Sequence, residues 1–321
     1  MILVTGGAGY IGSHAVKEFV ENGYECVVLD NLYNGHREAV VSDKFELADL
    51  LDKKALDSIF DNYNIDVVVH FAAMVRVDES VKNPEKYYEN NVMGTLNLLE
   101  SMRKHSVKNI IFSSTCATYG EPQYLPLDEK HPQNPINPYG MTKLICEKMI
   151  IDYHRAYDMN YIIFRYFNAA GASHDGTLGC SANVITHIIP VVLKHLKGET
   201  NELKIFGNNY NTPDGTCVRD YIHVEDLATA HRLAVEKIEN FSGAINLGTG
   251  KGYSVNEIVR ASELVTGKKC NVLYAARREG DAAELFADNK TARQVLSWQP
   301  KYTNLEDIIE SVWKWENNRR Y

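Results

Sequence analysis

Short apolar runs alternate with amphipathic segments through the first half of the 321-residue chain. Apolar side chains recur within these segments at helical spacing, as at Ile11, Ala15 and Phe19. Runs that are apolar throughout are typical of parallel strands buried on both faces. The alternation therefore predicts an α/β fold of the Rossmann type, with a right-handed, doubly wound parallel sheet. The runs are residues 2–4, 26–29, 67–69, 110–112 and 161–164, with a weaker one at 45–47.

The alternation gives way after about residue 168. Residues 171–183 and 208–216 are polar and rich in turn-forming residues, which indicates loops. Residues 244–247 form another buried run that could return to the main sheet. We therefore expect a Rossmann domain followed by a smaller C-terminal α/β domain that binds the substrate. The expected domains are 1–168, to which 219–248 returns, and 169–321.

A glycine-rich segment follows the first apolar run and opens the first helical segment. It places Gly6, Gly9 and Gly12 at three-residue intervals. Glycine permits a tight turn and a close approach of the backbone to a pyrophosphate, and a helix N-terminus offers free N–H groups to an anion. The same glycines could serve a plain strand–helix turn. Their place in a βαβ unit favours a dinucleotide site.

An aspartate ends the second apolar run. Asp30 lies 18 residues after Gly12, where a carboxylate can accept hydrogen bonds from an adenosine ribose and repel a 2′-phosphate. This position predicts NAD rather than NADP, although a solvated strand-end aspartate would look the same. Asp49, after the weaker run, could meet the adenine edge.

A tyrosine and a lysine four residues apart begin a helical segment after a proline-rich loop. Tyr139 and Lys143 share one helical face, and a nearby ammonium favours the phenolate, so we expect the pKa of Tyr139 to be lowered. Ser113, Ser114 and Thr115 end an earlier strand run at the edge where doubly wound sheets bind ligands. Thr115 can donate to a substrate oxygen beside Tyr139. The three hydroxyls could also bond local turns.

The bulk composition excludes several classes of function. The net charge of −8 argues against an unspecific binder of nucleic acid, whose domains are usually basic. The six cysteines form no CxxC pair and no cluster with metal-ligand spacing, so we expect no metal and a reducing compartment. No run approaches the roughly 20 apolar residues of a membrane span, and the start lacks a signal-peptide pattern. We expect a cytoplasmic protein without a membrane or nucleic-acid partner.

These motifs together resemble the short-chain dehydrogenase/reductase superfamily, and the long C-terminal part resembles its extended branch. Over nearly its whole length, the chain is similar to the UDP-glucose (UDP-galactose) 4-epimerase family. The resemblance implies NAD as cofactor, a UDP-hexose as substrate and a homodimer that pairs through the segments near 84–104 and 139–157. The segments that carry it are 5–12, 28–32, 70–73, 87–95, 112–120, 138–143, 165–168, 218–224 and 277–281.

The resemblance also implies a role for individual residues. Tyr139, Lys143 and Thr115 would be catalytic. Two arginines in the substrate set, Arg219 and Arg278, could form charge-assisted bonds to a diphosphate. The implied cofactor residues are Gly6, Gly9, Tyr10, Ile11, Gly12, Asp30, Asn31, Leu32, Tyr33, Asn34, Gly35, Asp49, Leu50, Phe71, Ala72, Ala73, Asn90, Ser113, Tyr139, Lys143, Tyr166 and Phe167. The implied substrate residues are Thr115, Asn168, His187, Ile188, Lys204, Ile205, Phe206, Arg219, Arg278, Asp281 and Leu285.

The sequence departs from the family pattern in three places. Val75 stands where some members have a lysine, with Arg76 beside it, and Asp78 stands where glycine is usual. Residues 180–184 differ from the usual acidic loop. Leu285 aligns with a position where a tyrosine can limit the sugar pocket, so a larger, N-acetylated sugar is an open possibility.

Three other functions are alternatives to C4 epimerisation through a 4-keto intermediate. A 4,6-dehydratase needs an acid/base pair directly after the active-site threonine, where this chain has Cys116 and Ala117. A net reductase must exchange its cofactor in every cycle. A catalytically silent NAD-binding regulator would not need Thr115, Tyr139 and Lys143 together. Turnover without added cofactor separates these functions.

Overall fold

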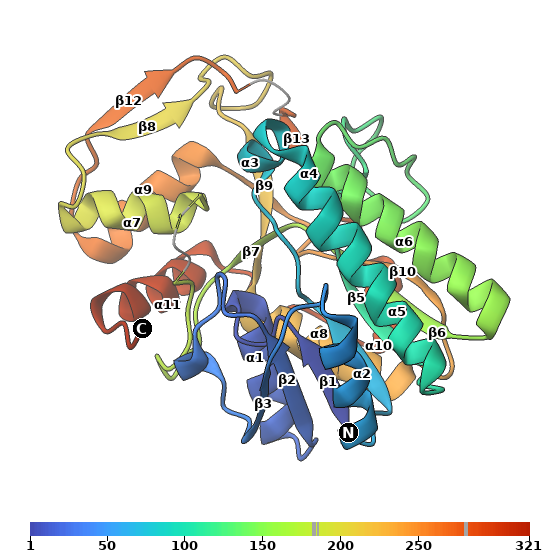
Figure 1. The fold of residues 1–321 in the computed structure, drawn as a ribbon. Coiled ribbons are helices and arrows are strands. Elements are labelled where there is room, and N and C mark those ends of the chain that lie inside the picture. The colour runs from blue at the N-terminus through green and yellow to red at the C-terminus, as the bar shows by residue number, and fades with distance from the viewer. Residues whose placement is uncertain (182–183, 185, 279–281) are drawn as a thin grey trace.

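The computed structural model describes residues 1–181, 184, 186–278 and 282–321. Its centre is a seven-stranded sheet in which every neighbouring pair is parallel, so the predicted Rossmann-type fold is confirmed (Figure 1). The weaker run at 45–47 lies in β3. In sheet order the strands are β10 (Gly243–Leu247), β6 (Asn160–Tyr166), β5 (Asn109–Thr115), β4 (Val67–His70), β1 (Ile2–Thr5), β2 (Cys26–Asp30) and β3 (Lys44–Leu47).

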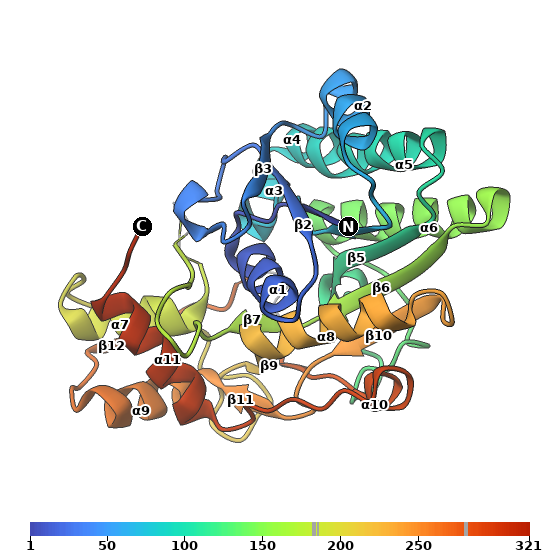
Figure 2. The ribbon, with the colours of Figure 1, turned by 90° about the horizontal axis from the view of Figure 1, so that it is seen from below.

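Helices cover both faces of this sheet, and Figure 2 shows the two layers. Alternate residues of β1 divide between the layers: Ile2 and Val4 face one core cluster and Leu3 faces the other. The first cluster includes α1, α8 and α10, and the second includes α2, α5 and α6. The helices are α1 (Tyr10–Glu21), α8 (Val224–Lys237) and α10 (Lys290–Leu296) on one face, and α2 (Lys53–Asn62), α5 (Gly94–Lys104) and α6 (Pro138–Tyr157) on the other.

The order in which strands are added to the sheet reverses between β1 and β4. From β1 the order runs to β2 and β3 on one side and to β4, β5 and β6 on the other. Such a switch point opens a crevice at the carboxyl ends of the strands, where doubly wound folds bind their ligands. Three short elements cross this edge after β4: α3 (Val77–Lys82), α4 (Pro84–Tyr87) and the π-helical η2 (Tyr88–Met93).

The C-terminal half adds two smaller sheets. One joins β11 (Gly252–Ser254), β9 (Val218–His223) and β13 (Glu284–Leu285), and β7 (Asn168–Ala170) also pairs with β9. The other pairs β8 (Leu203–Phe206) with β12 (Val272–Ala275). A separate core packs these sheets against helices. Those helices are α7 (Ile188–Lys197), α9 (Val255–Thr266) and α11 (Leu305–Asn317). None of the described helices is long and apolar enough to cross a membrane.

Residues 219–248 divide between the two parts. β10 pairs with β6 at the edge of the main sheet, and α8 packs against α1. β9, in contrast, lies in the smaller sheet, beside β7, β11 and β13. The domain boundary at residue 168 remains a prediction.

Candidate active site

The glycine-rich loop joins β1 to α1 and leaves no room for a side chain at Gly6 or Gly12. Gly6 has φ +72°, and a Cβ added at Gly12 would lie 2.2 Å from the Gly6 carbonyl oxygen. α1 begins after Gly9 without a side-chain cap among the described residues, so its first N–H groups point to the strand edge. This cradle fits the pyrophosphate of a dinucleotide.

Asp30 lies at the end of β2, next to this cradle. Its side chain is 7% exposed and accepts hydrogen bonds from Ala8 N at 3.0 Å and Leu32 N at 2.8 Å. Burial raises the pKa of Asp30, and these two hydrogen bonds oppose that shift. A carboxylate can accept about four hydrogen bonds, so acceptor capacity remains for a ribose diol.

A cavity of about 1750 Å³ runs along the carboxyl edge of the sheet and into the C-terminal half. It brings most of the residues named from the sequence to one surface. Leu32 and Leu285 do not line it, and Asp281 lies outside the described residues. The lining includes Gly6, Gly9, Tyr10, Ile11, Gly12, Asp30, Asn31, Tyr33, Asn34, Gly35, Asp49, Leu50, Phe71, Ala72, Ala73, Asn90, Ser113, Thr115, Tyr139, Lys143, Tyr166, Phe167, Asn168, His187, Ile188, Lys204, Ile205, Phe206, Arg219 and Arg278.

Tyr139 and Lys143 lie in the first two turns of α6 and face the cavity. Asn137 caps this helix by accepting a hydrogen bond from Gly140 N at 2.9 Å. Lys143 is 2% exposed, and its Nζ donates to the Ser113 carbonyl oxygen at 2.7 Å. Burial lowers the pKa of Lys143 to about 8. The lysine is therefore fixed to the end of β5 while it can still carry a proton near neutral pH.

The lowered pKa expected for Tyr139 is not what this structure gives. Burial, as the largest cause, raises the pKa of Tyr139, and the Tyr166 phenol adds to the rise. A hydrogen bond with the Thr115 hydroxyl opposes this rise. The Lys143 ammonium bonds to a backbone carbonyl instead of the phenol. The expectation was wrong because spacing along a helix does not account for desolvation.

The far end of the cavity is lined by cationic side chains of the C-terminal half. Arg219, on β9, is half-buried, and its Nη1 donates to the Val218 carbonyl oxygen at 2.8 Å. Arg278 is exposed, and its guanidinium lies 4.1 Å from the centroid of the Phe206 ring. Lys204, on β8, is also exposed. These groups can meet an anionic ligand from several directions.

Asn91 supports the site without lining the cavity, whereas the sequence had pointed only to its neighbour Asn90. Its side chain is 2% exposed, accepts from Met74 N at 2.8 Å and donates to Thr142 Oγ1 at 3.1 Å. It thus joins the segment after β4 to α6, beside Lys143. A signal was present in the sequence, because Asn91 belongs to the segment 87–95, but its partners are 17 and 51 residues away.

The unusual segment after β4 forms an ion pair at the cavity wall. Arg76 Nη2 lies 2.6 Å from Asp78 Oδ2, which lowers the pKa of Asp78 through their hydrogen bond. The second unusual segment, 180–184, is described in part: Cys180 is buried and its carbonyl oxygen accepts from Trp315 Nε1 at 3.2 Å.

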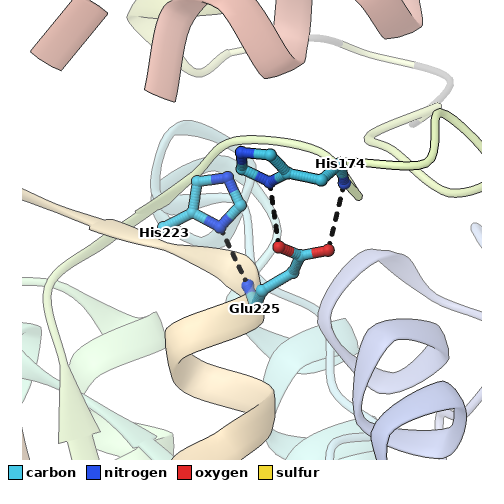
Figure 3. A group of neighbouring side chains, drawn as sticks. All are labelled: His174, His223 and Glu225. Carbon is cyan, nitrogen blue, oxygen red and sulfur yellow. Dashed lines mark hydrogen bonds and ion pairs between the residues drawn. The ribbon is translucent and has the colours of Figure 1, made fainter. Parts of the chain in front are cut away.

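Three side chains with metal-ligating atoms meet outside the cavity: His174, His223 and Glu225 (Figure 3). His174 Nδ1 lies 3.0 Å from Glu225 Oε2, and His223 Nδ1 accepts from Glu225 N at 3.1 Å. The other nitrogen of His223 lies 3.2 Å from Ser311 Oγ, which itself donates to Ile308 O. Both nitrogens of His223 thus form hydrogen bonds, and this side chain links α8 to α11.

Comparison with known proteins gives consistent relatives over almost the whole chain. Residues 2–248 match the model of the NAD dependent epimerase/dehydratase family. A UDP-glucose 4-epimerase of Halalkalibacterium halodurans is 50% identical over 316 residues, which cover 98% of this chain and 95% of the relative.

Two solved structures extend this similarity to the fold. A UDP-glucose 4-epimerase from Brucella ovis, in complex with NAD, is 48% identical with a TM-score of 0.94, covering 97% of this chain and 96% of its own. One from Bifidobacterium longum, in complex with NAD+ and UDP, is 38% identical with a TM-score of 0.95, covering 99% and 98%.

Proposed function

The chain belongs to the NAD dependent epimerase/dehydratase family, and on that basis we propose that it epimerises C4 of a UDP-hexose, interconverting UDP-galactose and UDP-glucose with NAD as cofactor. The observation that carries this proposal is the single cavity that holds Thr115, Tyr139 and Lys143 beside the glycine cradle and extends to Arg219 and Arg278. Such a cavity fits a nucleotide sugar whose C4 reaches the catalytic groups.

The cofactor and substrate ends of the cavity would hold their ligands by different groups. The cradle at residues 6–12 would receive the cofactor pyrophosphate, and Asp30 would accept from its adenosine ribose. Arg219 and Arg278 would pair with the diphosphate of UDP. The remaining residues named above as cofactor or substrate residues stay proposals, Leu285 and Asp281 among them.

The proton chemistry follows from the chain's own groups. Tyr139 would take the proton of the C4 hydroxyl, while Thr115 bonds the same oxygen. Bound NAD would supply the oxidation at C4 and its reversal. Lys143 would hold its positive charge near the phenol, which favours phenolate formation. The 4-keto sugar would then turn over in the cavity, anchored by UDP, so that C4 is reduced on its other face, and Tyr139 would return the proton to the C4 oxygen.

The geometry disfavours a dehydratase. Cys116 follows Thr115 at the cavity wall, and burial raises the pKa of its thiol to about 11. A thiol cannot replace the carboxylate that dehydration needs at this position. Ala117, the next residue, has no proton to exchange.

Turnover without added cofactor tests the proposal. Purified protein, charged once with stoichiometric NAD, should interconvert UDP-galactose and UDP-glucose, and no NADH should accumulate in solution. A net dehydrogenase would instead release NADH in proportion to the sugar consumed. Accumulation of NADH in proportion to the sugar consumed would overturn the proposed epimerase activity.

We further propose a cytoplasmic homodimer active in galactose metabolism. Apolar side chains that are exposed in the isolated chain, Tyr88, Met93 and Tyr157, lie on the helical segments through which we expect the subunits to pair. Light scattering after gel filtration should give twice the chain mass, and Met93→Asp should shift the protein towards the monomer. A parent protein that runs as a monomer at micromolar concentration would contradict this pairing.

A further inference from the structure

A buried carboxylate lies one helical turn beyond the catalytic lysine. Residues four apart share a helical face, so Tyr139, Lys143 and Glu147 succeed one another along one side of α6. Glu147 is 1% exposed. A charge buried this deeply is stable only when it is paired and hydrogen-bonded.

Donors from three other segments meet at this carboxylate. Ser114 Oγ donates to Oε1 from β5, and Gln133 Nε2 donates to Oε2 at 2.9 Å from the loop before α6. Arg165, on β6, donates from Nε at 3.1 Å and from Nη2 at 2.7 Å. Ser114 lies between Ser113, which accepts from Lys143, and Thr115. The Glu147 carboxylate therefore links α6 to the end of β5, which Tyr139 and Lys143 face.

The guanidinium of Arg165 extends this network to the far edge of the sheet. It is 6% exposed, and its Nη1 donates to the Tyr119 hydroxyl at 3.2 Å. Tyr119 in turn donates to Asn246 Oδ1 on β10 at 2.7 Å. Three strands and α6 thus share one buried polar network, which fixes a unique arrangement when every member is satisfied.

We propose that Glu147 is a positioning residue, which holds α6, and with it Tyr139 and Lys143, in register with Ser113 and Thr115 on β5. The inference rests on the proposed function for the roles of Tyr139 and Lys143. Glu147 itself does not line the cavity, so it acts through the helix that carries those two residues.

Glu147 also affects the charge of Lys143. Burial lowers the pKa of Lys143, and Cys146 and then Glu147 oppose this shift. Of the groups around the ammonium, burial lowers the pKa of His70, on β4, to about 3 and raises that of the Cys146 thiol to about 11, so both are neutral near pH 7. Glu147, paired with Arg165, supplies the negative charge. Its removal should lower the pKa of Lys143 below about 8.

Glu147→Gln tests the proposal, because it keeps the size of the side chain and removes its charge. We expect kcat to fall about ten- to a hundredfold, since small displacements of catalytic groups have effects of this size. KM for UDP-galactose should stay within about twofold, because the UDP groups lie elsewhere. The alkaline limb of the kcat profile should move to lower pH. Trace acetylation of Lys143 across pH, read by mass spectrometry, should show the same shift without any turnover.

Two further variants keep the test decisive if Glu147→Gln folds poorly. Ser114→Ala removes one hydrogen bond to Glu147 and leaves its charge, so kcat should fall about three- to tenfold with the alkaline limb in place. Glu18→Gln is the control: Glu18 pairs with Arg232 at 2.8 Å between α1 and α8, away from the cavity. It should lower stability and leave kcat and its pH profile unchanged.

The outcomes separate this inference from the proposed function. Wild-type kcat and an unmoved Lys143 titration in Glu147→Gln would overturn the positioning role, as would equal losses of kcat in Glu147→Gln and Glu18→Gln. If the parent protein does not interconvert the two sugars, the proposed function fails. The acetylation titration would still show whether Glu147 controls Lys143.

Discussion

The two ends of the cavity are built in different ways. At the cofactor end, the backbone makes the site: glycines leave no space beside Gly6 and Gly12, and Asp30 is held by two backbone N–H groups. At the substrate end, long side chains such as Lys204 and Arg278 reach into the cavity from short strands and loops. The difference fits the proposed function, in which the cofactor stays bound while the sugar turns over between two half-reactions.

Tyr139→Phe should cause the largest loss, because it removes the proton shuttle and leaves both ends of the cavity intact. General acid–base groups contribute typically 10²- to 10⁴-fold, so kcat should fall by about that factor. NAD binding, measured by calorimetry, should stay within about twofold of the parent. Full activity in this variant would show that another group moves the proton.

Low pH should destabilise the fold, because two histidines are buried in the helices that cover one face of the main sheet. Burial lowers the pKa of His14, on α1, and of His231, on α8, to about 4. Between about pH 6.5 and 4 the unfolded chain binds protons that the folded chain does not, so stability is full above pH 6.5 and falls as the pH drops through this range. Each histidine adds a slope of up to about 1.4 kcal/mol per pH unit.

Urea unfolding at several pH values measures this slope. Asp226, whose pKa burial raises to about 6, acts in the opposite sense, because the folded chain then holds a proton that the unfolded chain releases. The comparison is therefore made between the parent and His231→Gln. The free energy of unfolding should depend less steeply on pH in this variant, and an unchanged slope would refute the assignment.

Loss of a substrate-end arginine should weaken the binding of UDP without changing the binding of NAD. Arg219→Ala and Arg278→Ala should each weaken UDP binding about ten- to a hundredfold, since hydrogen bonds to charged groups contribute roughly 1.5–3 kcal/mol. NAD affinity should not change, because neither arginine lies at the cofactor end. Unchanged UDP titrations in both variants would place the diphosphate elsewhere.

Leu285→Tyr should have the smallest effect. Leu285 packs against the cluster of Tyr119, Leu127, Phe167 and Ala287 and does not line the cavity. If a larger side chain there still narrows the sugar pocket, the rate with UDP-N-acetylglucosamine should fall relative to that with UDP-glucose. A constant ratio of the two rates would show that this position does not contact the sugar.

The sequence could predict the features that depend on neighbours along the chain. The βαβ rhythm, the glycine cradle and the shared helical face of Tyr139 and Lys143 follow from short-range spacing. The partners of Asn91 and Glu147 are set by tertiary packing across 14 to 51 residues, which spacing does not contain. The pKa of Tyr139 was mispredicted for a related reason, since burial decides it and burial is a property of the whole fold.

The edge position of β10 ties the two halves of the chain together. A fragment that ended near residue 168 would leave β6 with a row of unpaired N–H and carbonyl groups, and the apolar face of α1 would lose its cover from α8. Exposed edges of this kind promote aggregation. The protein should therefore resist dissection into separately soluble pieces, and a nick in a surface loop should leave both fragments associated.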